Sequence, residues 1–291
     1  MSQKEDFRIA GTTGFTLVEL LVVMSIISML MSILMPSLTR TRESGRRVVC
    51  ASNLRQLTLA WNLYAMDNRD RLCSPDTGCL TASCWVVDGP ALPDNWIGGT
   101  ETAIKDGVLW HYTQSVKLYE CQSSWNYPTA NRRPGRLRDY AIPATMGYPY
   151  KRWMDDVNII STFSNLSGIT RPSEKMVFTD ADGGLRGARD DYWLCGLFWP
   201  LTESPTGLQW KFYRNGDGVP CNIITARHNS GSNLSFADGH CSYWRYKDQR
   251  TVKLADDETT RQNEIDASAD NPDLEYMIEL LKGKKGFNEG Y

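Results

Sequence analysis

A long apolar run near the N-terminus constrains this chain most. From Phe15 to Met35 almost every residue is apolar, and the only charged one is Glu19. That length is about what an α-helix needs to cross the hydrocarbon core of a bilayer. A cleaved secretory signal has a shorter apolar core and a small-residue cleavage site, for which Pro36-Ser37-Leu38 is a poor match. The sequence therefore predicts a membrane-spanning helix over residues 15–35.

Glu19 sets this run apart from a plain membrane anchor. A carboxylate inside a membrane helix is costly, usually functional, and needs a partner for its charge. Cleavage between Gly14 and Phe15 would create an α-amino group about one helical turn from Glu19. We expect that amine to pair with Glu19 of the same chain or of a neighbour. A plain signal anchor remains the alternative, but it does not account for Glu19.

The segment Gly14-Phe-Thr-Leu-Val-Glu19 resembles the processing site of type IV prepilins and type II secretion pseudopilins. The resemblance implies that a prepilin peptidase removes a leader, residues 1–14, by cutting after Gly14. It also implies N-methylation of Phe15, and a role for Glu19 in aligning subunits within a filament. The chain would then cross the cytoplasmic (inner) membrane once, with its head exported to the periplasm or cell surface.

Two features disagree about this topology. Just after the apolar run come Arg40, Arg42, Arg46 and Arg47, opposed only by Glu43, and the positive-inside rule would place them in the cytoplasm. The chain also has eight cysteines, an even number that suits disulfides in an oxidising compartment. We expect export, because the leader must face the cytoplasmic peptidase.

None of the cysteines forms a CxxC pair, so their spacing does not favour a thiolate zinc site.

The helix is expected to continue beyond the membrane. Cys50, Leu54, Leu57, Trp61 and Tyr64 recur at steps of four and three, which is one apolar stripe of an amphipathic helix. We predict a single helix over residues 15–66, bent near its proline and loosened near its glycine, whose second half packs on a globular head.

The rest of the chain predicts an α+β head over residues 67–250. About 250 residues outside the leader and membrane helix suffice for one domain with a core. Lys175 to Thr179 is a predicted strand, Ile104–Tyr112 a short helix, and Leu118–Cys121 a strand. Residues 251–291 are predicted to be an acidic linker followed by a helix from Asn271 to Leu281, with Pro272 at its start. The long helix should pack on an antiparallel sheet, as in a pilin-like roll.

A second motif lies near the C-terminus. Asp238-Gly239 between alternating segments predicts a β-hairpin over residues 233–244. His228, nine intervening residues and Asp238-Gly239 match the prepilin-type processing-associated H-X9-DG pattern. With Asn53-Leu-Arg-Gln-Leu57, this resembles a pilin-like family with a DUF1559-type head. That resemblance implies a Cys50–Cys121 disulfide, although Gln122-Ser-Ser replaces the proline that often follows the second cysteine.

The polar residues of these motifs also suggest catalytic and metal-binding roles. His228 and Asp238 are a possible base–orienter pair, but no GxSxG-like nucleophile motif is present, and Ser230 and Ser232 look like ordinary loop residues. A metal site of His228, Asp238 and His240 would need a convergence that spacing does not show. Calcium at Asp67, Asp70 and Asp76 matches no loop pattern. We therefore predict structural roles, with no catalytic residue, no metal and no cofactor.

The sequence predicts a structural subunit of a type II secretion or type IV pilus-like filament, and no enzyme activity. Its partners would be prepilin peptidase, other pilin-like subunits and the membrane. A balance of 32 basic and 34 acidic residues gives no nucleic-acid footprint. The alternative is an exported, membrane-anchored glycan-binding module whose tryptophans form a binding surface, for instance Trp85, Trp96, Trp193 and Trp199. An exported hydrolase is a third possibility with no supporting motif.

Overall fold

The computed structural model describes residues 15–75, 83–87, 101–124, 137–143, 145–147, 163–182, 197–198, 202–204, 207–209, 223–256 and 269–282. It divides into two compact units, Met1–Arg42 and Glu43–Tyr291. The helix α1 runs through both, so each part of it is described with its own unit.

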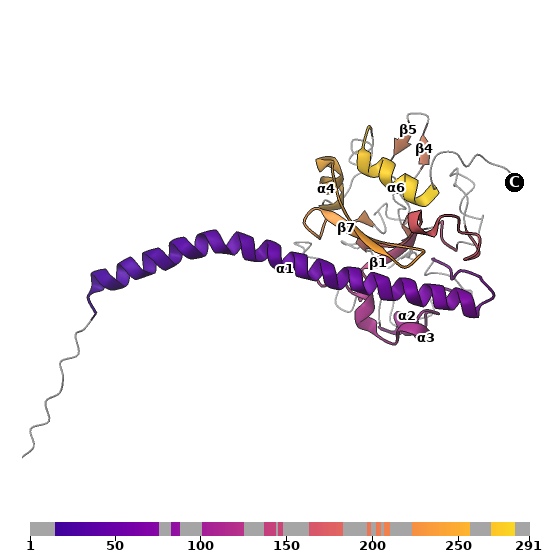
Figure 1. The fold of residues 1–291 in the computed structure, drawn as a ribbon, viewed down its shortest axis with the longest axis horizontal. Coiled ribbons are helices and arrows are strands. Elements are labelled where there is room, and N and C mark those ends of the chain that lie inside the picture. The colour runs from indigo at the N-terminus through magenta and orange to yellow at the C-terminus, as the bar shows by residue number, and fades with distance from the viewer. Residues whose placement is uncertain are drawn as a thin grey trace, which may run out of the picture. The chain divides into compact units, whose positions relative to one another are not determined.

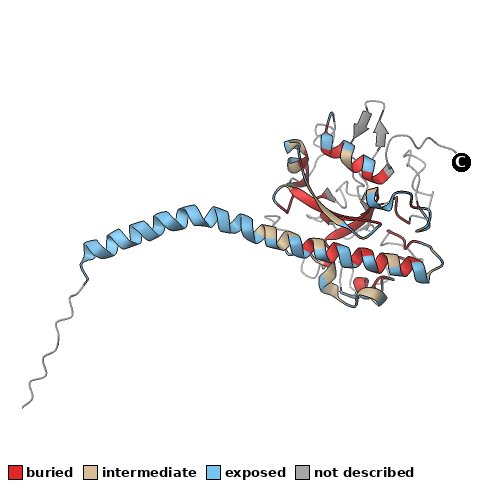
Figure 2. Cartoon of the chain, viewed as in Figure 1, coloured by how far each residue is buried: buried red, intermediate tan, exposed pale blue. Residues whose placement is uncertain are grey.

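Helix α1 spans Leu17–Asp67 and is unbroken at Pro36 and Gly45 (Figure 1). The predicted helix over residues 15–66 is thereby confirmed. In the first unit the large apolar side chains of α1 are exposed, from Leu17 through Leu38 (Figure 2). Among the described residues, α1 is the one helix long and apolar enough to cross a membrane, with a mean hydropathy of 2.5 over its most apolar window.

Within the head, α1 buries the stripe that its sequence predicts. Cys50, Leu54, Leu57 and Trp61 are completely buried and belong to one core cluster. The opposite face carries exposed residues such as Leu59. Polar residues beside the stripe bind the sheet: Thr58 Oγ1 donates to Ser235 Oγ over 2.7 Å.

The sheet against α1 contains four antiparallel strands in the order β1-β2-β7-β8. Their bounds are Tyr140–Pro143, Met176–Asp182, Gly231–Phe236 and Cys241–Arg245. This confirms the predicted α+β class. Two short strands extend it: β3 (Leu197–Phe198) pairs with β1 in parallel, and β6 (Ile223–Ile224) pairs with β2. A separate hairpin joins β4 (Thr202–Ser204) and β5 (Gly207–Gln209).

Side chains alternate between two cores on the two faces of the sheet, as the period of a strand requires. In β1, Tyr140 and Ile142 join the core that contains α1, whereas Ala141 joins the second core. Two C-terminal helices supply much of the second core: α4 (Gln249–Asp256) and α6 (Pro272–Lys282). Because both faces are covered, every residue of β1 and β7 is buried.

Helix α6 begins where the Asn-Pro sequence predicts. Asn271 Oδ1 accepts hydrogen bonds from the backbone N–H groups of Asp273 (2.9 Å) and Leu274 (3.2 Å), as an N-cap does. The buried Asp273 carboxylate in turn accepts from the Trp244 indole N–H at 2.9 Å and from the backbone after β8. This anchors α6 to the end of the hairpin.

One predicted strand is wrong. The segment before Cys121 holds α2 (Glu101–Lys105), α3 (Trp110–Thr113) and the 3₁₀-helix η1 (Val116–Tyr119), where a strand over Leu118–Cys121 was expected. A second 3₁₀-helix, η4 (Pro172–Glu174), forms the expected turn before β2. In η1 the apolar residues serve packing instead of strand pairing, since the buried Tyr119 ring stacks on Trp85 with centroids 6.0 Å apart.

Replacing Leu57 tests the packing of α1 on the head. Leu57→Ala removes a completely buried side chain and should lower the free energy of unfolding by about 2–5 kcal/mol. The matched change Leu59→Ala, at a side chain 58% exposed on the same helix, should stay within about 0.5 kcal/mol. Urea unfolding of the full chain in detergent, followed by tryptophan fluorescence, measures both. Equal effects would contradict the burial of this stripe.

Candidate functional site

The start of α1 is a capping box. Glu19 Oε2 accepts from the Thr16 backbone N–H at 2.9 Å and from the Thr16 hydroxyl at 2.7 Å, and the Glu19 N–H donates back to Thr16 Oγ1 at 3.3 Å. Such a Thr-x-x-Glu pair satisfies N–H groups that the first helical turn leaves free. In the uncleaved chain the Glu19 carboxylate therefore has a partner. This capping box was not predicted from the sequence, although a Thr-x-x-Glu sequence just before an apolar run usually indicates one. Pairing of Glu19 with a Phe15 amine stays a prediction for the cleaved chain.

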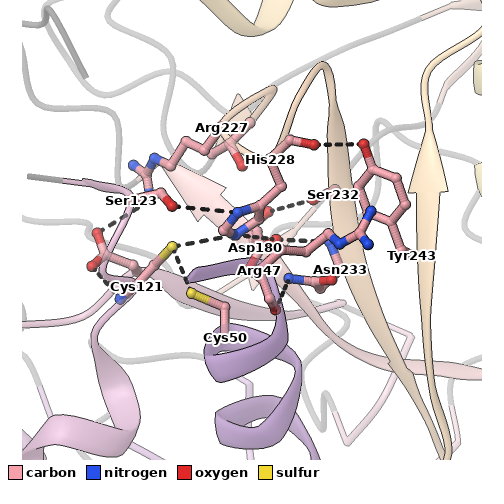
Figure 3. Close-up of polar contacts among 12 residues, drawn as sticks. Arg47, Cys50, Cys121, Ser123, Asp180, Arg227, His228, Ser232, Asn233 and Tyr243 are labelled. Carbon is pink, nitrogen blue, oxygen red and sulfur yellow. Dashed lines mark hydrogen bonds and ion pairs between the residues drawn. The ribbon is translucent and has the colours of Figure 1, made fainter. Parts of the chain in front are cut away.

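His228 lies in a buried polar cluster of the head (Figure 3). It precedes β7 and is joined to it by a turn in which Asn229 and Ser230 adopt left-handed backbone angles (φ 55° and 63°). Its Nδ1 is 2.8 Å from Glu43 Oε1 on α1. Its Nε2 is 3.4 Å from Asp180 Oδ2 on β2 and 3.4 Å from Cys121 Sγ. His228 thus connects the helix, the sheet and the segment after η1.

The two cysteines of the implied disulfide meet beside this histidine. Cys50 Sγ and Cys121 Sγ lie 3.0 Å apart, although the residues are 71 positions apart in sequence. Both are buried thiols. The juxtaposition that the resemblance implied is present, while the disulfide bond itself stays a prediction.

The pKa values of three groups in the cluster are shifted from their usual values. Burial opposes a positive His228, but Asp180, Cys121 and Glu43 outweigh it and raise the pKa of His228 to about 10. Burial likewise opposes a negative Glu43, yet its contacts with His228, Ser123 and Arg46 hold the pKa of Glu43 below its usual value. The Cys50 contact and burial raise the pKa of Cys121 well above that of a free thiol. The His228 imidazole and Glu43 therefore form a charged pair beside the neutral Cys121 thiol.

The segment that carries Cys121 is held from both sides. Asp139 Oδ2 accepts from the Cys121 backbone N–H at 2.8 Å and from the Ser124 hydroxyl at 2.9 Å, and Asp139 Oδ1 pairs with the buried Arg227 at 3.3 Å. From α1, the Asn53 amide donates to the Glu120 carbonyl at 3.1 Å. This contact gives a structural reason for an asparagine in the Asn53–Leu57 segment.

The hairpin braces the other side of His228. Asp180 Oδ2 accepts from the Asn233 backbone N–H at 2.7 Å, and the Asn233 side chain donates to the Arg47 carbonyl at 3.3 Å. The Arg47 guanidinium lies 4.3 Å from the centre of the Tyr243 ring, whose hydroxyl donates to the His228 carbonyl. These contacts join β7 and β8 to the first turns of α1 in the head.

Asp238 and Gly239 form the turn between β7 and β8. Gly239 has a φ of 90°, which a glycine adopts without strain. Asp238 Oδ1 accepts from the His240 backbone N–H at 3.1 Å and lies 2.6 Å from His240 Nδ1. The strand β7 separates this turn from His228 by roughly 20 Å at the rise of an extended strand. The structure therefore does not bring His228, Asp238 and His240 together.

The remaining candidate residues are placed as follows. Asp67 accepts a hydrogen bond from the Tyr112 hydroxyl at 2.9 Å. Asp70 Oδ1 accepts one from the Ser167 backbone N–H at 3.1 Å, so each carboxylate has a structural contact of its own. Trp85 is completely buried, so it cannot take part in a glycan-binding surface. Asp76, Trp96, Trp193 and Trp199 lie outside the described residues.

A family model described as a prokaryotic N-terminal methylation motif matches residues 11–35. The chain carries a prepilin-type N-terminal methylation motif. The match covers Gly14, Phe15 and Glu19 together with most of the exposed apolar part of α1. No curated protein and no solved structure matches the chain. The DUF1559-type and H-X9-DG resemblance of the head stays a prediction.

Removing the Asp139 carboxylate tests whether the cluster is a stabilising network. Asp139→Ala leaves the Arg227 guanidinium, the Cys121 N–H and the Ser124 hydroxyl without this buried acceptor. We expect a loss of about 3–5 kcal/mol in the free energy of unfolding. The exposed Asp106 provides the matched control, since Asp106→Ala should change stability by less than about 0.5 kcal/mol. Denaturant unfolding of the full chain checks both, and a small effect of Asp139→Ala would refute the network.

Proposed function

We propose that this chain is a structural subunit of a type IV pilus-like or type II secretion filament, cut after Gly14 and N-methylated on Phe15. The observation that carries the proposal is the methylation motif over residues 11–35, which leads directly into a helix able to span a membrane. The motif supports recognition by prepilin peptidase and export of the head. The apolar part of α1 supports assembly with other pilin-like subunits.

The proposal includes no catalytic activity. The histidine best suited to act as a base, His228, is completely buried and already contacts Glu43 and Asp180. A general base has to reach the proton that it removes from a substrate. The burial of His228 therefore supports a role within the protein. The burial of Trp85 weakens the glycan-binding alternative.

Processing is tested by intact mass and N-terminal sequencing of the protein from membranes of cells with and without prepilin peptidase. We expect a chain that begins at methylated Phe15 only when the peptidase is present. Gly14→Val should leave the chain starting at Met1, whereas Gly11→Val, a change at the other leader glycine, should be processed normally. A wild-type chain that keeps residues 1–14 in cells with the peptidase would refute the proposal.

Assembly is tested separately at Glu19. Glu19→Val should be cleaved and methylated like the wild type, because Gly14 and Phe15 are intact, but it should fail to enter filaments since the carboxylate partner of the new amine is lost. Ser25→Val is the matched control: the Ser25 hydroxyl donates within its own helix, to the Leu21 carbonyl at 2.8 Å. Cross-linking and sedimentation of sheared filaments measure incorporation. Normal incorporation of Glu19→Val would remove Glu19 from the assembly mechanism.

A further inference from the structure

Four metal-binding side chains from four separate segments converge at the buried cluster. Cys50 comes from α1, Cys121 from the segment after η1, Asp180 from β2 and His228 from the loop before β7 (Figure 3). The two Sγ atoms and a ring nitrogen of His228 all lie within 4.8 Å of one another. All four residues are completely buried. We propose that Cys50, Cys121 and His228 bind a zinc ion, with the Asp180 carboxylate beside it.

The distances among Cys50, Cys121 and His228 are close to those between ligand atoms on one zinc ion. Zinc–sulfur bonds of about 2.3 Å and zinc–nitrogen or zinc–oxygen bonds of about 2.0–2.2 Å place neighbouring ligand atoms roughly 3.3–3.8 Å apart. His228 Nε2 is 3.4 Å from Cys121 Sγ and 3.4 Å from Asp180 Oδ2. The sulfur pair, at 3.0 Å, has to open by about 0.7 Å to reach the upper end of this range, which is the value for two sulfur ligands. A rotation of one cysteine side chain supplies a shift of that size.

The second ring nitrogen of His228 is already held as in a metal site. Its Nδ1 lies 2.8 Å from Glu43 Oε1. A histidine that binds metal through one nitrogen commonly donates the other N–H to a carboxylate, which fixes the ring and strengthens the ligand. With zinc on Nε2, the Nδ1–H would donate to Glu43. Glu43 is then a positioning residue for the site.

Asp180 provides an independent reason to expect a cation. Its Oδ1 is buried and has no hydrogen-bond partner among the described residues, although its Oδ2 accepts from the Asn233 backbone. A buried carboxylate oxygen without a partner is costly. His228 Nε2 already lies 3.4 Å from Oδ2 of this carboxylate, and a zinc ion beside Oδ1 would give the second oxygen a positive partner as well. A disulfide between Cys50 and Cys121 would leave it as it is.

Zinc binding and the disulfide exclude each other, because both use the same two sulfur atoms. Zinc takes the thiolate form of cysteine, so binding releases both thiol protons and any proton on His228 Nε2. The buried ligands are reached while the head folds, and bound zinc would therefore contribute to its folding stability. This inference concerns the head and does not depend on processing or filament assembly.

The test uses the full chain purified in detergent without chelators. Elemental analysis should find about one zinc per chain, and replacement by Co²⁺ should produce the near-ultraviolet absorption of a thiolate–cobalt bond. Cys50→Ser and His228→Asn should abolish stoichiometric zinc. Cys241→Ser is the matched control, because Cys241 is a free thiol outside the cluster, and this variant should keep the metal.

A milder variant covers the case in which ligand substitutions unfold the head. Glu43→Gln keeps an oxygen acceptor for Nδ1–H and should weaken zinc binding about 10- to 100-fold in chelator competition. Two results would overturn the proposal. One is wild-type protein without zinc in which peptide mapping finds Cys50 linked to Cys121. The other is reduced wild-type protein that takes up neither Zn²⁺ nor Co²⁺.

Discussion

Burial of one face of α1 against an antiparallel sheet is the interaction on which the head depends. The apolar part of that contact comes from Leu54, Leu57 and Trp61. Removal of apolar surface from water is the main stabilising term in folding. Polar contacts set its register, since Thr58 binds Ser235 and the Asn62 amide donates to the Ala237 carbonyl at 3.2 Å. The same strands carry their other side chains into a second core beneath α6. Helix, sheet and C-terminal helix therefore stabilise one another.

The first turns of α1 in the head meet a very different environment. There the helix contributes Glu43, Arg47 and Cys50 to a buried cluster of charge and sulfur around His228. Burying such groups is unfavourable unless each finds a partner. Most do, through hydrogen bonds that join residues far apart in the sequence. Among the described residues, Asp180 Oδ1 is a buried oxygen without a hydrogen-bond partner, which supports the proposed cation.

The N-terminal motif combines two physical requirements in a few residues. Thr16 and Glu19 close the first turn of α1 in the uncut chain, so the carboxylate has a partner before processing. After cleavage, the same carboxylate is close in sequence to a new amine. A carboxylate at this position therefore suits both the precursor and the proposed filament subunit, which explains how an apolar helix can carry one acidic residue.

Local and periodic features of this protein could be predicted from its amino-acid sequence. Helix faces, caps and turns depend on residues that are close together in the sequence. This is why the sequence predicts the apolar run, the stripe from Cys50 to Tyr64, the Asp238-Gly239 turn and the start of α6. The sequence motif also drew attention to His228, but it did not predict which side chains contact its ring. A short apolar run can form either a strand or a short helix, and at Leu118–Cys121 the local pattern predicted a strand where the structure has a 3₁₀-helix.

Which distant side chains meet depends on the packing of the folded chain. No spacing rule places Glu43, Asp180 and Cys121 around His228, because they come from a helix, a strand and a loop whose approach depends on the whole sheet. The absence of a CxxC pair argued against a thiolate site, yet folding brings Cys50 and Cys121 within 3.0 Å of each other. Ligand geometry of this kind is a property of packing between elements, and periodicity within one element does not contain it.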